Sequence, residues 1–135
     1  MLDRIFLDYN STTPLDPTIA TLIEPYYSQN FGNPASSTHE HGKIAKKVVE
    51  NSRSSIAGAL ECNPDEIYFT SGATESINMT IKGIVFASNL KAKHIVTLKT
   101  EHKAVLDTCE YVRKLGVEID YLDVENEGYI DIGSL

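Results

Sequence analysis

The chain has 135 residues, with 12 Lys plus Arg against 19 Asp plus Glu, and a formal net charge of −7 at pH 7. A chain of this length buries about two thirds of its unfolded surface, so it supports one domain or part of one, and its 41% hydrophobic and 23% charged residues exclude a disordered or fibrous protein. The negative charge argues against a nucleic acid or an anionic membrane as a partner, and the apolar runs are too short to span a bilayer.

Residues 1–64 hold all five prolines and predict a helical or irregular arm. Residues 5–7 favour a short strand, and Asp16 followed by Pro17 is typical of a helix start. We expect Pro25, which has no amide hydrogen, to kink or end this helix. The apolar spacing predicts that the helix buries one face, made of Ile19, Leu22, Ile23, Tyr26 and Tyr27.

A longer helix is predicted between the 30–37 loop and Leu60, because the next residues, 63–65, are typical of a helix end. Its expected apolar face contains Ile44, Val48, Ile56 and Leu60. The exposed face of such a helix accommodates charged side chains, and the lysines between residues 43 and 47 fit that position. Residues 1–64 therefore predict two helices joined by loops.

From residue 65 the pattern changes to repeated strands, turns and helices. Strands are predicted at 67–69, 94–98 and 117–121, with a fourth short strand at 129–132. The helices between them carry two apolar stripes, Ile77, Ile81, Ile84 and Val85 in the first and Val105, Cys109, Val112 and Leu115 in the second. Gly116 is placed to end the second helix. Strands separated by helices of this length predict an α/β fold with a doubly wound, mainly parallel sheet.

Ligands bind beyond the carboxyl ends of the strands in such sheets, where the loops 71–76 and 100–103 are expected to share one edge. In the first loop, Ala73 and Thr74 present free amides at a helix start, and the hydroxyls of Ser71 and Thr74 can donate to phosphate oxygens. The same residue types also suit an ordinary helix cap, and the segment matches neither common phosphate-binding glycine motif. The spacing alone leaves both interpretations open.

The second loop places His102 beside Glu101 at the same edge. An imidazole ring can stack on a ligand and move protons near neutral pH, although an exposed histidine at a helix start is the simpler interpretation. Glu101 fits the favourable electrostatics of a first helical turn. His39 and His41 point to different faces if they lie on a helix, which argues against a metal pair.

The only two cysteines, Cys62 and Cys109, lie far apart and show no metal-ligand spacing. This usage is typical of a reducing compartment, and Cys109 is expected in the core. The N-terminal residues show neither a signal-peptide nor a transit-peptide pattern. The sequence therefore predicts a cytoplasmic protein without a metal site.

Four segments, at 7–14, 31–36 with His39, 71–76 and 100–107, resemble in order and spacing the N-terminal part of cysteine desulfurases. These are pyridoxal 5'-phosphate (PLP) enzymes of fold type I, in the class V aminotransferase group. The resemblance covers essentially the whole chain. It implies that residues 65–135 are the first part of the PLP-binding α/β large domain, and that residues 1–64 form an arm of the small domain near the active-site entrance.

The resemblance also implies roles for individual residues. Ala73 and Thr74 match the positions that bind the PLP phosphate, and His102 matches the histidine that stacks on the pyridine ring and assists proton transfer. The loops 10–13 and 33–39 match segments near the active-site entrance and the subunit interface. The family's Schiff-base lysine and persulfide cysteine lie further along the chain, and no residue of 1–135 matches either of them.

The implied activity is conversion of L-cysteine to L-alanine, with persulfide sulfur left on the enzyme for iron–sulfur cluster assembly. The implied partners are L-cysteine, a sulfur-acceptor or scaffold protein, and a second copy in a homodimer. We expect these residues alone to be catalytically incomplete, because PLP chemistry needs its lysine. Two alternatives stay open: a related class V PLP enzyme such as a selenocysteine lyase, and a non-catalytic phosphate-binding or interaction module.

Overall fold

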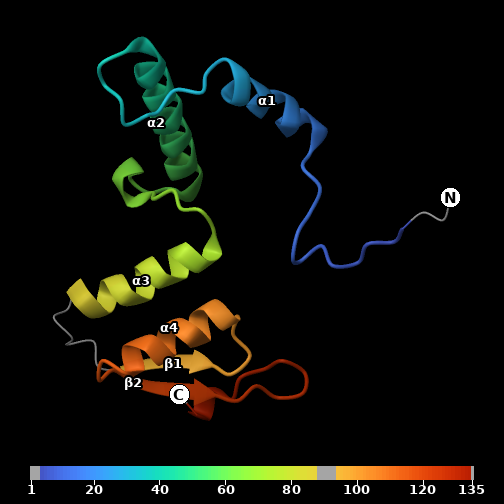
Figure 1. Ribbon diagram of the computed structural model, residues 1–135. Helices are drawn as coiled ribbons and strands as arrows, with labels where there is room; N and C mark the ends of the chain where they lie inside the picture. The colour runs from blue at the N-terminus through green and yellow to red at the C-terminus, as the bar shows by residue number, and fades with distance from the viewer. Residues whose placement is uncertain (1–3, 88–93, 135) are drawn as a thin grey trace. The chain divides into compact units, whose positions relative to one another are not determined.

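The structure is a computed structural model that describes residues 4–87 and 94–134 (Figure 1). The chain forms two compact units, the first ending at Tyr68 and the second beginning at Phe69. The domain boundary that the sequence places after residue 64 stays a prediction. Within the described ranges, no helix is long and apolar enough to cross a membrane.

The first unit contains helix α1 (Pro17–Ser28), helix α2 (Glu40–Leu60) and the 3-10 turn η1 (Pro64–Glu66). The predicted start of α1 is confirmed, because a carboxylate oxygen of Asp16 accepts the amides of Thr18 at 2.7 Å and Ile19 at 3.3 Å. Pro25 does not end α1, contrary to one of the two predicted outcomes. The helix continues for three residues, since the Pro25 carbonyl accepts the amides that follow at Gln29 and Asn30, both at 2.8 Å.

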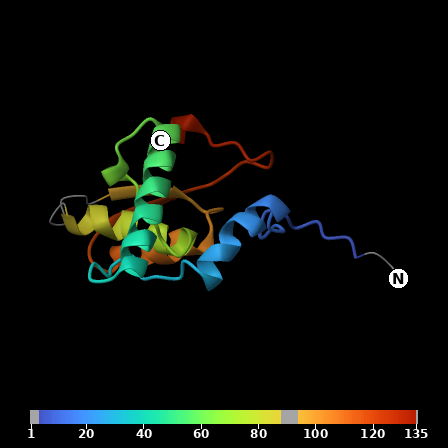
Figure 2. The same ribbon diagram turned by 90° about the horizontal axis from the view of Figure 1, so that it is seen from above.

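The predicted burial of α1 is wrong in this chain. The helix has no buried residue, and Tyr27 is 81% exposed. The stripe has the correct helical spacing, but no other element of the described chain packs closely over it. Residues 5–7 form no strand either, because their backbone finds no strand partner among the described residues, and the two views show an extended segment before α1 (Figures 1 and 2).

Helix α2 ends at Leu60 as predicted and runs as one continuous helix (Figure 2). The side chains it buries differ from those expected. Its buried residues are Gly42, Ala45 and Ala57, while Ile44, Ile56 and Leu60 are exposed. At Gly42 the reason is close contact, because the backbone of Ser36 packs against the helix there. At its far end, η1 contacts α2 and the guanidinium of Arg53 donates to the carbonyl of Ile67.

The second unit contains helix α3 (Ala73–Ala87), strand β1 (His94–Leu98), helix α4 (Lys103–Arg113), strand β2 (Glu118–Leu122) and the 3-10 turn η2 (Ile132–Ser134). The strands pair in parallel, with His94 opposite Glu118 and Leu98 opposite Leu122. This confirms the second and third predicted strands and their direction. Gly116 closes the turn that follows α4, as predicted. Its φ of 96° lets the chain turn from the helix towards β2.

Two predicted strands are absent from this unit or its border. Residues 67–69 carry no strand, and Tyr68 is 70% exposed rather than buried. Residues 129–132 carry no strand because the chain turns at Gly128, where the Glu125 amide donates to the Tyr129 carbonyl at 2.9 Å, and then enters η2. A strand needs a partner for its backbone groups, and none of the described residues supplies one here.

The core of the second unit lies where α3, α4 and the two strands meet. It consists of Val85, Val112 and Val117, with Ile81, Ile95 and Ile119 packed against them. Four members of the predicted helical stripes, Ile81, Val85, Cys109 and Val112, are thus confirmed, whereas Leu115 is exposed. Ile84 is 60% exposed, contrary to prediction, because only Val85 of this adjacent pair faces α4 and the sheet.

We expect Val112→Ala to lower the free energy of unfolding by roughly 2 kcal/mol, because a fully buried side chain leaves a cavity when it is shortened. The matched control is Ile84→Ala, which removes a larger but exposed side chain and should change stability by less than about 0.5 kcal/mol. Urea unfolding of both variants measures the difference. Equal losses would contradict the core described here.

Candidate functional site

The start of α3 presents unused hydrogen-bond donors. Ala73 and Thr74 are the first two residues of the helix and are exposed. In the described part of the chain, neither their backbone amides nor the Thr74 hydroxyl donates to any acceptor. The first amides of a helix have no partner inside it and carry the positive end of the helix dipole. This end of α3 therefore suits an anion, as the sequence predicts.

Ser71 differs from its predicted role. Its hydroxyl and its backbone amide both donate to one carboxylate oxygen of Glu75, at 2.7 and 2.6 Å. The Ser71 hydroxyl is therefore engaged within the loop, whereas the Thr74 hydroxyl has no acceptor among the described residues. The hydrogen bonds from Ser71 hold the pKa of Glu75 below its usual value, so this carboxylate is charged at neutral pH.

A second contact closes the same loop from its other side. The hydroxyls of Thr70 and Ser76 are 2.7 Å apart, and each also lies 3.3 Å from the carbonyl oxygen of Gly72. The turn into α3 is thus tied at two places. Its conformation is held by side chains that leave Ala73 and Thr74 uncovered.

His102 caps the start of α4. Its Nδ1 accepts the backbone amide of Ala104 at 3.1 Å, and the side chain is exposed. A neutral imidazole that accepts at Nδ1 carries its proton at Nε2, so the ring has a defined orientation and a free N–H. The two interpretations of His102 are therefore compatible, since the ring caps the helix with one nitrogen and leaves the other available.

A groove of about 310 Å³ runs between α3 and α4. Its lining residues are Thr74, Asn78, Lys82, Ala104, Asp107, Thr108 and Tyr111. Thr74 and Ala104 lie early in their helices, whereas Lys82 and Tyr111 lie later and meet where the ammonium group is 4.4 Å from the ring centre. The helices therefore run in the same direction, and both starts lie on the side where β1 ends (Figure 1).

The structure thus brings the three predicted site residues to one region of the second unit. Thr74 lines the groove itself, Ala73 precedes it, and His102 holds the amide of the lining residue Ala104. No sequence pattern predicts the contact between Lys82 and Tyr111, which are far apart along the chain and meet only in the folded unit. Together, free amides, a free hydroxyl and an imidazole N–H can bind an anion and move a proton beside it.

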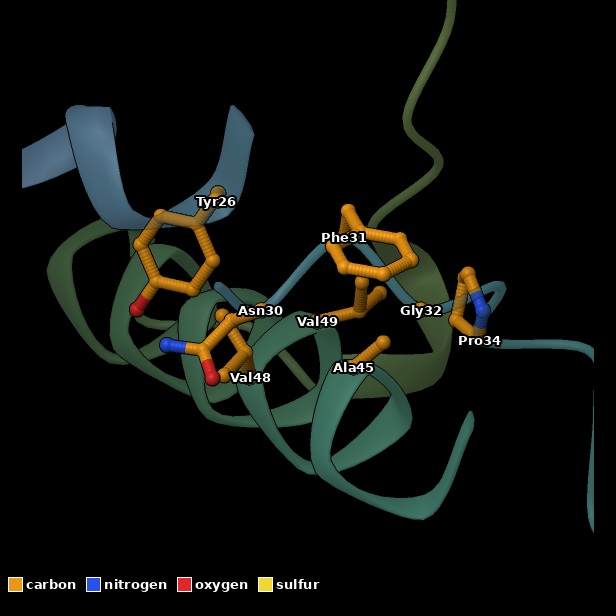
Figure 3. A pocket seen from close by; sticks show the side chains of 8 residues that line it. All are labelled: Tyr26, Asn30, Phe31, Gly32, Pro34, Ala45, Val48 and Val49. Carbon is orange, nitrogen blue, oxygen red and sulfur yellow. The ribbon is translucent and has the colours of Figure 1, made fainter. Parts of the chain in front are cut away.

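The first unit has an apolar groove of about 220 Å³ (Figure 3). Tyr26 and Phe31 lie on one side of it, and Ala45, Val48 and Val49 of α2 lie on the other. Apart from the Tyr26 phenol, this lining offers no ionisable or nucleophilic side chain. The groove is therefore a packing feature rather than a candidate active site.

The two histidines of this unit have structural partners. Nδ1 of His39 accepts the Gly42 amide at 3.2 Å, and the ring of His41 stacks on Phe31 with 5.6 Å between ring centres. In residues 4–87 and 94–134, no three potential ligands come together in a way that could hold a metal ion. Cys109 is fully buried, as predicted, and burial raises the pKa of its thiol.

Comparison with known proteins gives consistent matches along the chain. The family model described as aminotransferase class-V matches residues 5–135. The mitosomal cysteine desulfurase of Encephalitozoon cuniculi is 50% identical over 131 residues, which is 96% of this chain and 30% of that protein. The cysteine desulfurase IscS of Methylobacillus flagellatus is 51% identical over 129 residues, covering 95% of this chain and 32% of that protein.

Solved structures show the same relationship. A NifS-like protein superposes with a TM-score of 0.89 at 34% identity, over 97% of this chain and 36% of its own. DndA from Streptomyces lividans superposes with a TM-score of 0.70 at 39% identity, over 87% of this chain and 33% of its own. These similarities confirm the predicted α/β fold as part of a fold type I large domain preceded by a helical arm. The chain spans about a third of the length of these relatives.

Proposed function

Because the chain belongs to the aminotransferase class-V family, we propose that it is the N-terminal part of a PLP-dependent cysteine desulfurase. The proposed reaction converts L-cysteine to L-alanine and leaves persulfide sulfur on the enzyme for iron–sulfur cluster assembly. The observation that carries the proposal is that α3 and α4 begin at the same end of the α3–α4 groove, with Ala73 and Thr74 at the start of one helix and His102 capping the other. About half of the residues are identical to those of proteins named cysteine desulfurase, which supports this choice of substrate.

The residues present fit a phosphate group. The amides of Ala73 and Thr74 and the Thr74 hydroxyl are unused donors at the positive end of α3, which suits the PLP phosphate. When bound, PLP supplies an electron sink for the carbanion that forms at Cα of an amino acid. In this chain Ala73 and Thr74 would hold the phosphate. The pyridine ring of PLP would then lie beside His102.

His102 is suited to orient the ring and to move a proton at one defined atom. Its Nδ1 is engaged by the Ala104 amide, so proton transfer takes place at Nε2. The cap also restricts rotation of the imidazole, which lowers the entropy cost of stacking. The same contact that stabilises the start of α4 thus prepares the ring for its proposed role.

Several parts of the proposal concern the whole protein. The Schiff-base lysine and the persulfide cysteine would come from residues other than these, because none of the cysteines or lysines here matches them. A homodimer, a sulfur-acceptor or scaffold partner and a cytoplasmic location belong to the same proposal. One similar protein is described as mitosomal, so fractionation of the native cells is the direct check of location.

The proposal is tested by co-expressing this chain with a second chain, the part of the Methylobacillus flagellatus relative that this chain does not cover. We expect PLP to co-purify with the complex and L-alanine to form from L-cysteine, while the chain alone forms none. A folded complex that binds PLP but releases product only from selenocysteine would favour the selenocysteine lyase alternative. A folded complex without PLP or L-alanine would contradict the proposed function.

Thr74→Val is expected to weaken PLP binding by roughly tenfold or more, because it removes one hydrogen bond to a charged phosphate and keeps the side-chain volume. Thr74→Ser, which keeps the hydroxyl, should remain within a few-fold of the unaltered protein. Titration of the co-expressed complex, followed by PLP fluorescence, measures both. Equal affinity in the two variants would show that the hydroxyl does not contact the phosphate.

A further inference from the structure

Glu75 stands out in the candidate site because it is a negative charge at the place where an anion would bind. It lies in the first turn of α3, one residue after Thr74. A carboxylate there favours the positive end of the helix dipole, but it also repels a nearby phosphate. Its contacts therefore need a physical explanation.

Those contacts are directed to a single residue. One oxygen of Glu75 accepts both the amide and the hydroxyl of Ser71, at 2.6 and 2.7 Å. Both polar hydrogens of Ser71 are thereby engaged inside the loop. Among the described residues, the amides of Ala73 and Thr74, two and three positions after Ser71, and the Thr74 hydroxyl have no acceptor.

The opposite side of the loop is held separately. Thr70 and Ser76 are joined through their hydroxyls and share the Gly72 carbonyl oxygen as a partner. This second tie would remain if Glu75 were replaced. Loss of the carboxylate would therefore release Ser71 and disorder the part of the loop that leads into Ala73 and Thr74, while the second tie keeps Thr70 and Ser76 joined.

We propose that Glu75 is a positioning residue of the cofactor-phosphate site, which engages Ser71 and keeps the loop in the shape that leaves the Ala73 and Thr74 amides free. This inference rests on the proposed function. In this arrangement the hydrogen-bond acceptor of Glu75 matters, and its charge does not. Replacement of Glu75 by glutamine, which has the same size and an uncharged acceptor oxygen, should therefore preserve the site.

The test compares Glu75→Gln with Glu75→Ala in the 135-residue chain, with PLP and inorganic phosphate as probes. Binding is followed by fluorescence for PLP, and by the amide chemical shifts of Ala73 and Thr74 in NMR for both probes. We expect Glu75→Ala to weaken binding by roughly tenfold, since the loop loses two hydrogen bonds that order it. Glu75→Gln should bind at least as tightly as the unaltered chain, because its amide oxygen still accepts from Ser71.

The possible outcomes separate the explanations. Tighter binding in both variants would show that Glu75 only repels the anion, and would overturn the proposal. Unchanged affinity in Glu75→Ala, with a lower unfolding temperature, would show a capping role alone and would also overturn it. An unaltered chain that is folded by circular dichroism but binds neither probe at millimolar concentration would overturn this inference together with the proposed phosphate site. Binding by the unaltered chain separates failure of the inference from failure of the proposed function.

Discussion

Gly42→Ala is expected to destabilise the first unit by about 3 kcal/mol or more, the largest stability effect that we predict for a single methyl group. A Cβ atom at Gly42 would lie 2.0 Å from the carbonyl oxygen of Ser36 and 2.9 Å from its carbonyl carbon. These are backbone atoms, which cannot move aside as a flexible side chain can. The loop before α2 would have to leave the helix.

The same helix provides the matched control. A Cβ atom at Gly58 would meet no other atom within 4 Å, so Gly58→Ala should stabilise α2 by about 0.5–1 kcal/mol through its higher helix propensity. Urea unfolding followed by circular dichroism compares the two variants. A neutral or stabilising Gly42→Ala would contradict the close packing of the 30–37 loop on the start of α2.

The contact has a counterpart on the loop itself. A Cβ atom at Gly32 would lie 2.1 Å from the carbonyl oxygen of His41, so loop and helix approach each other through a glycine on each side. Phe31 and His41 stack beside this contact, and His39 caps the helix. The segment that the resemblance places near the active-site entrance is therefore held to α2 by backbone proximity. One glycine of the loop, Gly32, and one of the helix, Gly42, therefore cannot be replaced without a shift.

His102→Asn should lower turnover of L-cysteine in the co-expressed complex by a factor of about 10² to 10⁴, which is the usual contribution of a positioned general acid or base. Asparagine is a favourable residue at a helix start and can accept the Ala104 amide in place of the imidazole. It cannot stack as a ring or move a proton near neutral pH. This variant therefore removes the proposed function of the residue and keeps its cap.

The comparison with His102→Ala separates the two roles. Alanine removes ring and cap together, so it should lower turnover to a similar extent and also reduce stability by about 1 kcal/mol. Steady-state kinetics and thermal unfolding of both variants provide the measurements. If His102→Asn retained full turnover, His102 would be a helix cap and nothing more.

Much of the candidate site follows from the sequence because helix starts are local features. Asp16, Ala73, Thr74 and His102 act within a few residues of their own positions, and the structure places each of them at the predicted helix start. The contact between Ser71 and Glu75 is not predicted by the capping-box pattern, because the glutamate follows the serine by four residues and not by three. The structure differs from the predicted donation to a phosphate, because the Ser71 hydroxyl donates to Glu75.

The sequence by itself determined the helices and two parallel strands, and its motifs were enough to indicate the family. It did not determine which apolar stripes are buried: α1 has the spacing of a buried face and no buried residue, and α2 buries small residues in place of Ile44 and Ile56. The tertiary structure alone decided these features, and it alone formed the groove in which Lys82 meets Tyr111. Spacing and caps depend on neighbours within one or two helical turns, whereas burial depends on which distant segment packs on a face and how closely it approaches.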